Sequence, residues 1–446
     1  MPRDSAGAAD GKSLARVSLT GVGIRAAGAA GGFLFNVILA RTLGKAGAGS
    51  IMLYLNFATM IGLVATGGMD VVGLRELSRH AGDEAEAPAV LARIFPAALA
   101  SVLLFSFGGL VFLWLFGRSL TGLGGASICL VSALMLGLTA LQKIFSDWLI
   151  GLRELVASQL VFYFLNRVTS LILIAAIVAS SFRDRMSGQV FVVAYAAGLL
   201  LAVLYAIARI SVHFAGRREA RRSRPAIPLL RDGIACATQN AAFILLNLSP
   251  FLLLGALSTP AQIGLFGVSQ RLVAIVILAL TTISQLAMRD FSSAFGARDF
   301  ASLARALTAS IRLTFAAAIG LSLPLIVFAP FWVSIFGKSF AAAAPTLALF
   351  SVAICAQCLG MPFQAALLTT NHERPARNVT IVCAVIGVAL NALLVPHWGA
   401  LGAALGTGTG LALQSIGHAV YSLRVLPLRF HLMLFAIFPR RARVGV

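Results

Sequence analysis

The chain has 446 residues, of which 59% are hydrophobic and only 11% are charged, and its mean hydropathy is +0.94. So much apolar surface cannot be buried inside one water-soluble globule, so the composition excludes a soluble protein and predicts a polytopic membrane protein. The net charge of +20 comes mainly from arginines in short segments between apolar runs, which favours membrane orientation and contact with anionic lipids over nucleic-acid binding.

The first half of the chain predicts six spanning helices. Residues 1–16 are polar and basic and form a predicted cytoplasmic tail. The apolar run that follows is long enough to cross about 30 Å of hydrocarbon, so we expect a spanning helix and not a cleaved signal peptide. The predicted N-lobe, 17–212, contains the runs 17–39, 50–72, 94–116, 126–148, 160–180 and 190–212.

An arginine-rich connector at 213–232 divides the chain, and the second half predicts six more spans. The tail at 425–446 is predicted to be cytoplasmic, since its apolar stretch is too short to cross a membrane. The predicted C-lobe, 233–424, contains the runs 235–257, 263–288, 313–336, 342–368, 379–395 and 401–423.

Charged or aromatic residues mark the predicted surfaces of the membrane. The stretch 75–93 is interpreted as a loop or interfacial helix, and 289–312 as a helix lying on the surface. The four tryptophans, Trp114, Trp148, Trp332 and Trp398, all fall at predicted span ends, which is typical of interfacial anchors.

Loop charges predict the orientation. Most loop arginines lie at the helix ends that share a side with both termini and the connector. By the positive-inside rule that side is cytoplasmic. The opposite ends hold only Arg41, Lys45, Arg118, Arg183, Arg185 and Lys338.

Two local echoes indicate an internal duplication. The sequence Phe116-Gly117-Arg118-Ser119 corresponds to Phe336-Gly337-Lys338-Ser339, and residues 43–49 correspond to 257–264. An even number of spans in each half gives both halves the same orientation. We therefore predict two six-helix lobes related by a pseudo-two-fold axis along the membrane normal.

Four cations fall within or near the predicted apolar slab: Arg25, Lys143, Arg167 and Arg271. A charged side chain at the bilayer centre costs about 2.5 to 3.5 kcal/mol on insertion scales, so such residues are functional candidates. The repeat offsets place Asn56 opposite Arg271, and Arg25 opposite Gln239 or Asn240. We predict a substrate site in which Arg25 and Arg271 bind phosphate oxygens, with Asn56, Asn240, Arg167 and Lys143 as further candidates. The alternative for each cation is snorkelling to the interface or pairing with a polar neighbour.

Other polar residues favour structural roles. Asp70, Asp147 and Asp290 could take part in cation coupling, but their places near span ends favour solvated or arginine-paired acids. Intramembrane amides such as Asn391, and His418, are interpreted as hydrogen-bonded packing residues. The five cysteines lie in apolar runs, and Cys355 and Cys358 have no second ligand pair. No nucleotide loop, zinc cluster or catalytic triad is present in the sequence, so we predict no catalytic residue, no bound metal and no cofactor.

The chain resembles the polysaccharide-transporter (Wzx-type) flippases. The resemblance is carried by Leu39-Ala40-Arg41-Thr42-Leu43-Gly44, by Gly264-Leu265-Phe266-Gly267 leading to Gln270-Arg271-Leu272, and by the block from Phe336 through Asn391 and Pro396 to Gly402-Ala403-Ala404. It covers about residues 14 to 425. These flippases belong to the superfamily of multidrug and toxin extruders and the lipid II flippase. The lipid II flippase usually has two further spans, which this tail does not supply.

The resemblance implies two facing lobes, a cationic central cavity and alternating access that moves undecaprenyl-diphosphate-linked oligosaccharide to the outer leaflet of the bacterial inner membrane. It implies that Arg25 and Arg271 are cavity arginines. The expected partners are the lipid-linked substrate, anionic lipids, polysaccharide polymerase machinery and a coupling cation. Two alternatives remain at this point: a multidrug extruder of the same fold, for which buried acids would suit cationic drugs better, and a membrane polymerase or ligase, which needs larger outer loops.

Overall fold

The computed structural model describes residues 4–79, 86–121, 126–179, 187–214, 244–370 and 372–426, and every regular element in these ranges is a helix. Contacts divide the chain into two compact units, Met1–Ile244 and Leu245–Val446. The all-α membrane architecture is therefore confirmed. The exact bounds of the lobes, the connector and the tails stay predictions.

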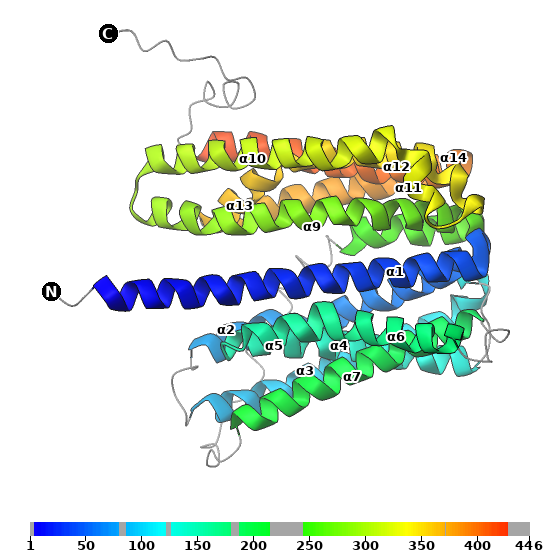
Figure 1. The fold of residues 1–446 in the computed structure, drawn as a ribbon, viewed down its shortest axis with the longest axis horizontal. Coiled ribbons are helices and arrows are strands. Elements are labelled where there is room, and N and C mark those ends of the chain that lie inside the picture. Colours follow the sequence, from blue (N-terminus) through cyan, green and yellow to red (C-terminus); the bar gives the residue numbers. More distant parts are fainter. Residues whose placement is uncertain are drawn as a thin grey trace, which may run out of the picture. The chain divides into compact units, whose positions relative to one another are not determined.

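The first unit is built from one very long helix, several shorter ones and a π-helical turn (Figure 1). Its elements are α1 (Asp4–Ala65), α2 (Met69–Arg79), α3 (Glu86–Thr121), α4 (Ala126–Gly151), α5 (Leu155–Gln159), η1 (Leu160–Leu165, the π-helix), α6 (Asn166–Ala179) and α7 (Gly188–Phe214).

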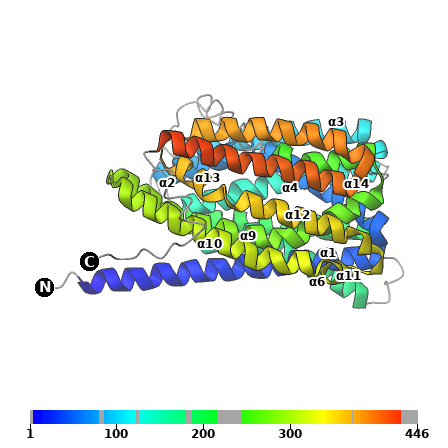
Figure 2. The same ribbon diagram turned by 90° about the horizontal axis from the view of Figure 1, so that it is seen from above.

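The second unit has the same helical character (Figure 2). Its elements are a helix at Ile244–Leu257, α9 (Pro260–Gly296), α10 (Phe300–Val327), α11 (Ala329–Ser334), the 3-10 helix η3 (Lys338–Ala343), α12 (Ala344–Cys358), α13 (Met361–Thr369) and α14 (Glu373–Val425).

Within the described ranges, nine helices are long and apolar enough to cross a membrane. Two of them contain a kink at a glycine in the left-handed region: Gly44 in α1, with φ 65°, and Gly399 in α14, with φ 52°. Glycine reaches this region without the strain that a Cβ would cause. Each kinked helix therefore supplies two crossings, and the short helix Ile244–Leu257 supplies one more, which agrees with the predicted twelve.

The kink in α14 is held by a side chain from α9. The backbone N–H of Ala400 donates to Gln262 Oε1 at 2.9 Å, and a Cβ at Gly399 would lie 2.7 Å from the same oxygen. The Gln262 side chain thus accepts a hydrogen bond from a backbone N–H that has no partner within the helix at the kink. A Cβ at residue 399 would occupy the space that this amide needs.

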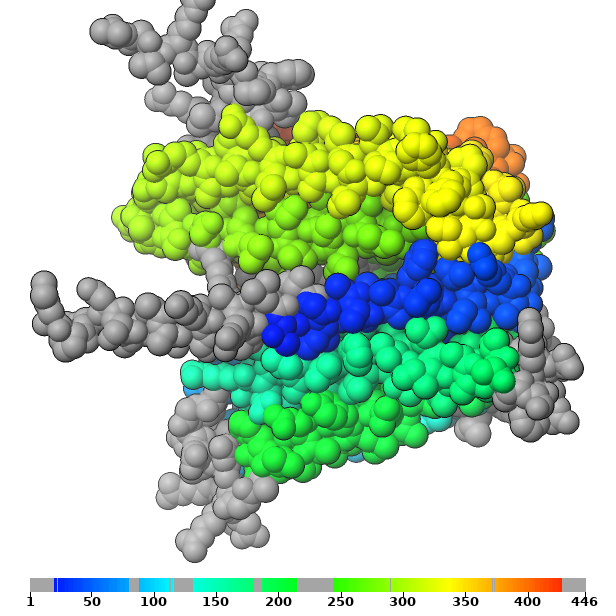
Figure 3. Space-filling view, viewed as in Figure 1, coloured from blue at the N-terminus to red at the C-terminus, as the bar shows by residue number. Residues whose placement is uncertain are grey.

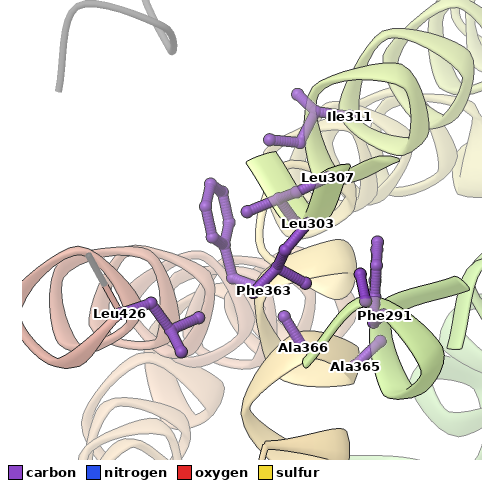
Figure 4. Packing of buried hydrophobic residues seen from close by; sticks show 9 residues of the cluster. Phe291, Leu303, Leu307, Ile311, Phe363, Ala365, Ala366 and Leu426 are labelled. Carbon is purple, nitrogen blue, oxygen red and sulfur yellow. The ribbon is translucent and has the colours of Figure 1, made fainter. Parts of the chain in front are cut away.

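The predicted surface-lying helix at 289–312 is wrong. α9 continues without a break to Gly296, and α10 starts at Phe300, so both spanning helices extend and pack along each other (Figure 3). Of the three phenylalanines that suggested a surface helix, Phe291 belongs to a buried cluster (Figure 4), Phe295 packs against this cluster while partly buried, and Phe300 is exposed. The described members of the cluster are Phe291, Ala294, Leu303, Leu307, Ile311, Phe363, Ala365, Ala366 and Leu426.

Trp148 corrects a second expectation, because this side chain is fully buried and is not an interfacial anchor. Its Nε1 donates to the carbonyl oxygen of Met69 at 3.0 Å, and its ring lies against Gly73 of α2. Trp114 and Trp398 are exposed as predicted. Trp148 therefore fixes the start of α2 against α4.

The cysteines agree with their predicted structural role as far as the described side chains go. Cys355, Cys358 and Cys383 are free thiols in the second unit. In the described part of the chain, no group of three or more His, Cys, Asp or Glu side chains has the arrangement of a metal site.

The contact of Trp148 with α2 predicts a strong effect of Gly73→Ala. The added Cβ would lie 1.8 Å from Trp148 Nε1, so either α2 or the indole must move. Overpacking of this kind typically destabilises by about 1 to 3 kcal/mol. We expect a clearly lower thermal midpoint in detergent. Gly108→Ala is the matched control, because nothing lies within 4 Å of the Cβ position there. Equal midpoints for the two variants would contradict this account of Trp148.

The turn between α9 and α10 predicts a pH-dependent contribution to stability. Asp299 caps α10: its Oδ1 accepts from Ser302 N at 2.9 Å and its Oδ2 accepts from Ser302 Oγ at 2.5 Å. The hydrogen bond from the Ser302 hydroxyl lowers the pKa of Asp299 below its ordinary value, and the bond from the Ser302 backbone N–H lowers it further. The stabilisation is therefore present above the unfolded pKa of about 3.9 and is lost as the pH falls through the folded pKa.

We accordingly expect Asp299→Ala to lower the thermal midpoint at pH 7, and the difference from wild type to shrink on acidification below about pH 4. Asp290→Ala, at an exposed acid in α9, is the control. A difference that stays constant across this pH range would mean that the charged form of Asp299 contributes nothing.

Candidate functional site

A close helix contact in the first unit brings two of the predicted cations to one place. Glycines on one face of α1 meet the continuous segment formed by α5, η1 and α6. A Cβ at Gly28 would lie 2.0 Å from the carbonyl oxygen of Tyr163, so the α1 backbone touches the π-helix directly. Small residues allow this approach in membrane helices. We call the contact the α1–η1 seam, defined by Arg25, Gly28, Gly32, Gln159, Tyr163 and Arg167.

Arg25 is held in this seam by two neutral groups. Its Nε donates to Gln159 Oε1 at 2.6 Å, and its guanidinium carbon lies 5.1 Å from the centre of the Tyr163 ring. Gln159 is buried, whereas Arg25 and Tyr163 are half-buried. A hydrogen bond and a cation–π contact orient a guanidinium without neutralising it.

Arg167 lies further along the same seam. Its Cδ would be 3.1 Å from a Cβ at Gly32, so the aliphatic part of the side chain rests on the glycine. No ion pair joins Arg167 to a carboxylate among the described residues. Gly32 follows Arg25 by two helical turns, which corresponds to about 10 Å at the usual rise. The seam therefore contains two cations at successive positions along the α1 axis: Arg25 of α1 itself, and Arg167 of α6, which contacts α1 at Gly32.

The seam depends on the π-helix, which the sequence pattern does not indicate. η1 covers Leu160–Leu165 and places Gln159, Tyr163 and Arg167 toward α1. π-helical turns are rare and occur frequently at functional sites. Gln159 and Tyr163 were missed as candidates. The available signal was that Gln159, Tyr163 and Arg167 follow one another at intervals of four residues, which places all three on one side of a helix.

Lys143 has different surroundings from the other cations. Its Nζ forms an ion pair with Asp147 Oδ2 and lies 3.9 Å from Asp70 Oδ2. It also lies 5.6 Å from the centre of the Phe162 ring. The expectation that Asp70 and Asp147 are solvated or arginine-paired is wrong, because both are buried and their partner is a lysine.

The remaining candidates are not brought to the seam by the described contacts. Asn56 is buried and donates to the carbonyl oxygen of Met52 within its own helix, at 2.7 Å. Asn240 lies outside the described residues. Arg271 is half-buried in α9 of the second unit, and its predicted position facing Arg25 stays a prediction.

Polar groups inside the second unit agree with the packing interpretation. Asn391 is fully buried and donates to Thr407 Oγ1 at 3.1 Å. His418 lies within hydrogen-bond distance of Thr380 Oγ1, at 3.4 Å, and of the Ala376 carbonyl oxygen, at 3.2 Å. These groups connect neighbouring stretches of α14 to each other.

Comparisons with known proteins place the chain. Residues 18–288, more than half of the chain, match the family of polysaccharide biosynthesis proteins. No curated protein matches the chain in sequence.

Solved structures with the same fold are membrane transporters. An inward-facing multidrug resistance MATE transporter of the MOP superfamily gives a TM-score of 0.73 at 15% identity, covering 91% of this chain and 95% of that one. The lipid II flippase MurJ, in an inward closed conformation, gives 0.70 at 10% identity, covering 94% and 89%. A MOP superfamily transporter from Pyrococcus furiosus, described as having a binding pocket of reverse polarity, gives 0.60 at 15% identity, covering 92% and 94%.

The fold predicted by resemblance is thus confirmed, and the spanning helices, the fold and the family agree with one another. The chain belongs to the polysaccharide biosynthesis protein family and is a multi-pass membrane protein with the fold of the multidrug extruders and the lipid II flippase.

Proposed function

We propose that the protein is a flippase that moves undecaprenyl-diphosphate-linked oligosaccharide across the bacterial inner membrane by alternating access, with both termini in the cytoplasm. The observation that carries the proposal is the α1–η1 seam, which holds Arg25 and Arg167 between spanning helices. Family membership supports a role in polysaccharide assembly.

The chemistry of the seam suits a diphosphate. Guanidinium groups bind phosphate oxygens through paired, charge-assisted hydrogen bonds, and they stay protonated even where water is scarce. Gln159 and Tyr163 occupy one nitrogen and one face of the Arg25 guanidinium. A guanidinium has five N–H donors, and in this proposal N–H groups of Arg25 bind the phosphate oxygens of the ligand. In this proposal Arg271 of the second unit contributes the corresponding contact.

The energy source follows from what the sequence contains. A flippase without a nucleotide-binding loop must use an ion gradient or the substrate gradient. Anionic lipids would contact the basic helix ends, and the enzymes that polymerise the flipped oligosaccharide would be downstream partners.

A multidrug extruder of the same fold is less well supported. Cationic drugs need buried carboxylates that face the ligand, but the carboxylates of Asp70 and Asp147 both face the ammonium of Lys143. At this place a drug cation would compete with Lys143 for the two carboxylates, whereas an anionic head group at the seam would meet two arginines.

Removing the charge of Arg25 should weaken substrate recognition. Loss of a charge-assisted hydrogen bond costs about 1.5 to 3 kcal/mol, so Arg25→Ala should weaken binding of undecaprenyl diphosphate about ten-fold to hundred-fold. Arg25→Lys should be intermediate, because lysine keeps the charge and loses the paired donors. Binding is measured on purified protein in nanodiscs, and flipping by restoration of surface polysaccharide in a strain without its own flippase.

Arg79→Ala is the matched control for this experiment, since Arg79 is an exposed arginine of α2 that pairs with Glu76. Arg167→Ala should weaken binding less than Arg25→Ala, because no described side chain orients its head group. Normal binding and normal flipping by Arg25→Ala at normal expression would rule out the proposed site.

The glycine face of α1 predicts a separate effect on the same site. Gly28→Ala would place a Cβ 2.0 Å from the Tyr163 carbonyl oxygen and so push α1 away from η1. We expect flipping to be lost and the Arg25 contacts with Gln159 and Tyr163 to be weakened. Gly23→Ala is the control on the same helix, because nothing lies within 4 Å of its Cβ position. If both variants flip substrate equally well, the close approach of α1 to η1 is not needed for transport.

A further inference from the structure

A buried cluster in the first unit has an unbalanced charge. It consists of Asp70 at the start of α2 and Lys143 and Asp147 one turn apart on α4, and we call it the carboxylate–lysine cluster. Trp148 fixes its geometry, because the indole hydrogen bond to Met69 holds the residue next to Asp70 against α4. Two carboxylates and one ammonium leave one negative charge in excess when all three are ionised.

Asp70 bears most of this imbalance. Its side chain is only 2% exposed, and its Oδ2 is 3.9 Å from the lysine, beyond a direct hydrogen bond. Its Oδ1 is buried and has no hydrogen-bond partner among the described residues. An uncompensated buried charge is strongly unfavourable, and one added proton would make the cluster neutral. Hard metal cations need about six oxygen ligands, and here the ammonium already lies beside both carboxylates.

Several charged groups on the elements around the cluster form ion pairs with one another. On α2 and α3, Glu76 pairs with Arg79 and Arg93. Between α4 and α7, Glu154 pairs with Arg209. The other charged or titratable side chains described on the elements that pack around the cluster are Arg25, Arg41, Lys45, Tyr54, Arg75, Arg153, Tyr163, Arg167, Tyr195, Tyr205 and His213.

The cluster is physically connected to the α1–η1 seam. Lys143 lies over the ring of Phe162, and the next residue, Tyr163, lies under the guanidinium of Arg25. The two rings touch edge to face, with centroids 4.9 Å apart. Both residues belong to the π-helix η1. A change in charge at Lys143 and a ligand bound at Arg25 therefore both act on the rings of Phe162 and Tyr163.

We propose that Asp70, Lys143 and Asp147 form a proton-binding site, and that η1 couples its occupancy to anion binding at Arg25. The first part stands on the cluster alone, and the second rests on the proposed function. An anion bound at the seam disfavours a second negative charge nearby, so ligand binding should be accompanied by proton uptake at the cluster.

The proton site is tested without any ligand. Infrared difference spectra between pH 5.5 and 8.5, recorded on the full-length protein in nanodiscs, should show a protonated carboxyl band that is lost in Asp70→Asn or Asp147→Asn. The triple variant D70N/K143M/D147N keeps the cluster neutral, so it provides a folded reference if a single variant is unstable. Asp290→Asn, at an exposed acid, should leave the band unchanged. A band that persists in the triple variant would overturn the proton site.

The coupling is tested with undecaprenyl diphosphate as the probe. Its affinity for the wild type should rise between pH 8 and pH 6 by about five-fold or more beyond the change seen in the triple variant, which retains only the titration of the probe itself. Phe162→Ala should bind the probe and still show the carboxyl band but lose the extra pH dependence. Phe107→Ala, at a side chain 66% exposed on α3, should behave as wild type.

The outcomes separate the two proposals. Failure of the wild type to bind the probe contradicts the proposed flippase function and leaves the infrared result to decide the proton site. Binding with the same pH dependence in wild type and triple variant overturns the coupling. An affinity that follows sodium concentration and not pH also overturns it.

Discussion

The direct contact between the α1 backbone at Gly28 and the π-helical carbonyl of Tyr163 is the constraint on which the proposed site depends. With a Cβ at position 28 the two helices could not come this close, and Arg25 would not reach both Gln159 and Tyr163. The same π-helix presents Phe162 to Lys143 on its other side. The π-helix that makes this backbone contact therefore supplies the aromatic ring that each of the two half-buried cations faces.

The two cations differ in the charge of their partners. Arg25 contacts an amide and an aromatic ring, and neither of these groups carries a charge. Lys143 is oriented by carboxylates, so its charge is balanced within the protein. Sequence position alone gave both residues the same interpretation, as cations within the apolar slab. The difference arises from Asp147, one turn along α4, and from Asp70, which is distant in sequence and comes from the short helix α2.

Much of the fold follows from the sequence, because the lipid imposes simple rules. Helix length, apolar content and loop charge predicted the twelve crossings, and the glycine at position 44 lies within a motif that marked the family resemblance. Three features were not predictable. An aromatic side chain near a span end has the same pattern whether it anchors at the interface or is buried, as Trp148 is. A π-turn does not change the apolar pattern, so the close approach of the Tyr163 backbone to α1 was not recognised. The amphipathic stretch after Met288 suits a surface helix as well as it suits an extended hairpin.

The kinks at Gly44 and Gly399 have a consequence for the face of the membrane where they lie. At each of them two crossings meet at a single residue within one helical element, without an intervening loop. Proteases cleave several residues of extended chain, and bulky macromolecules recognise exposed loops, so these two junctions offer little to either. In the orientation proposed from the distribution of arginines, this face is turned away from the cytoplasm, where it would meet the hydrolases of the cell envelope.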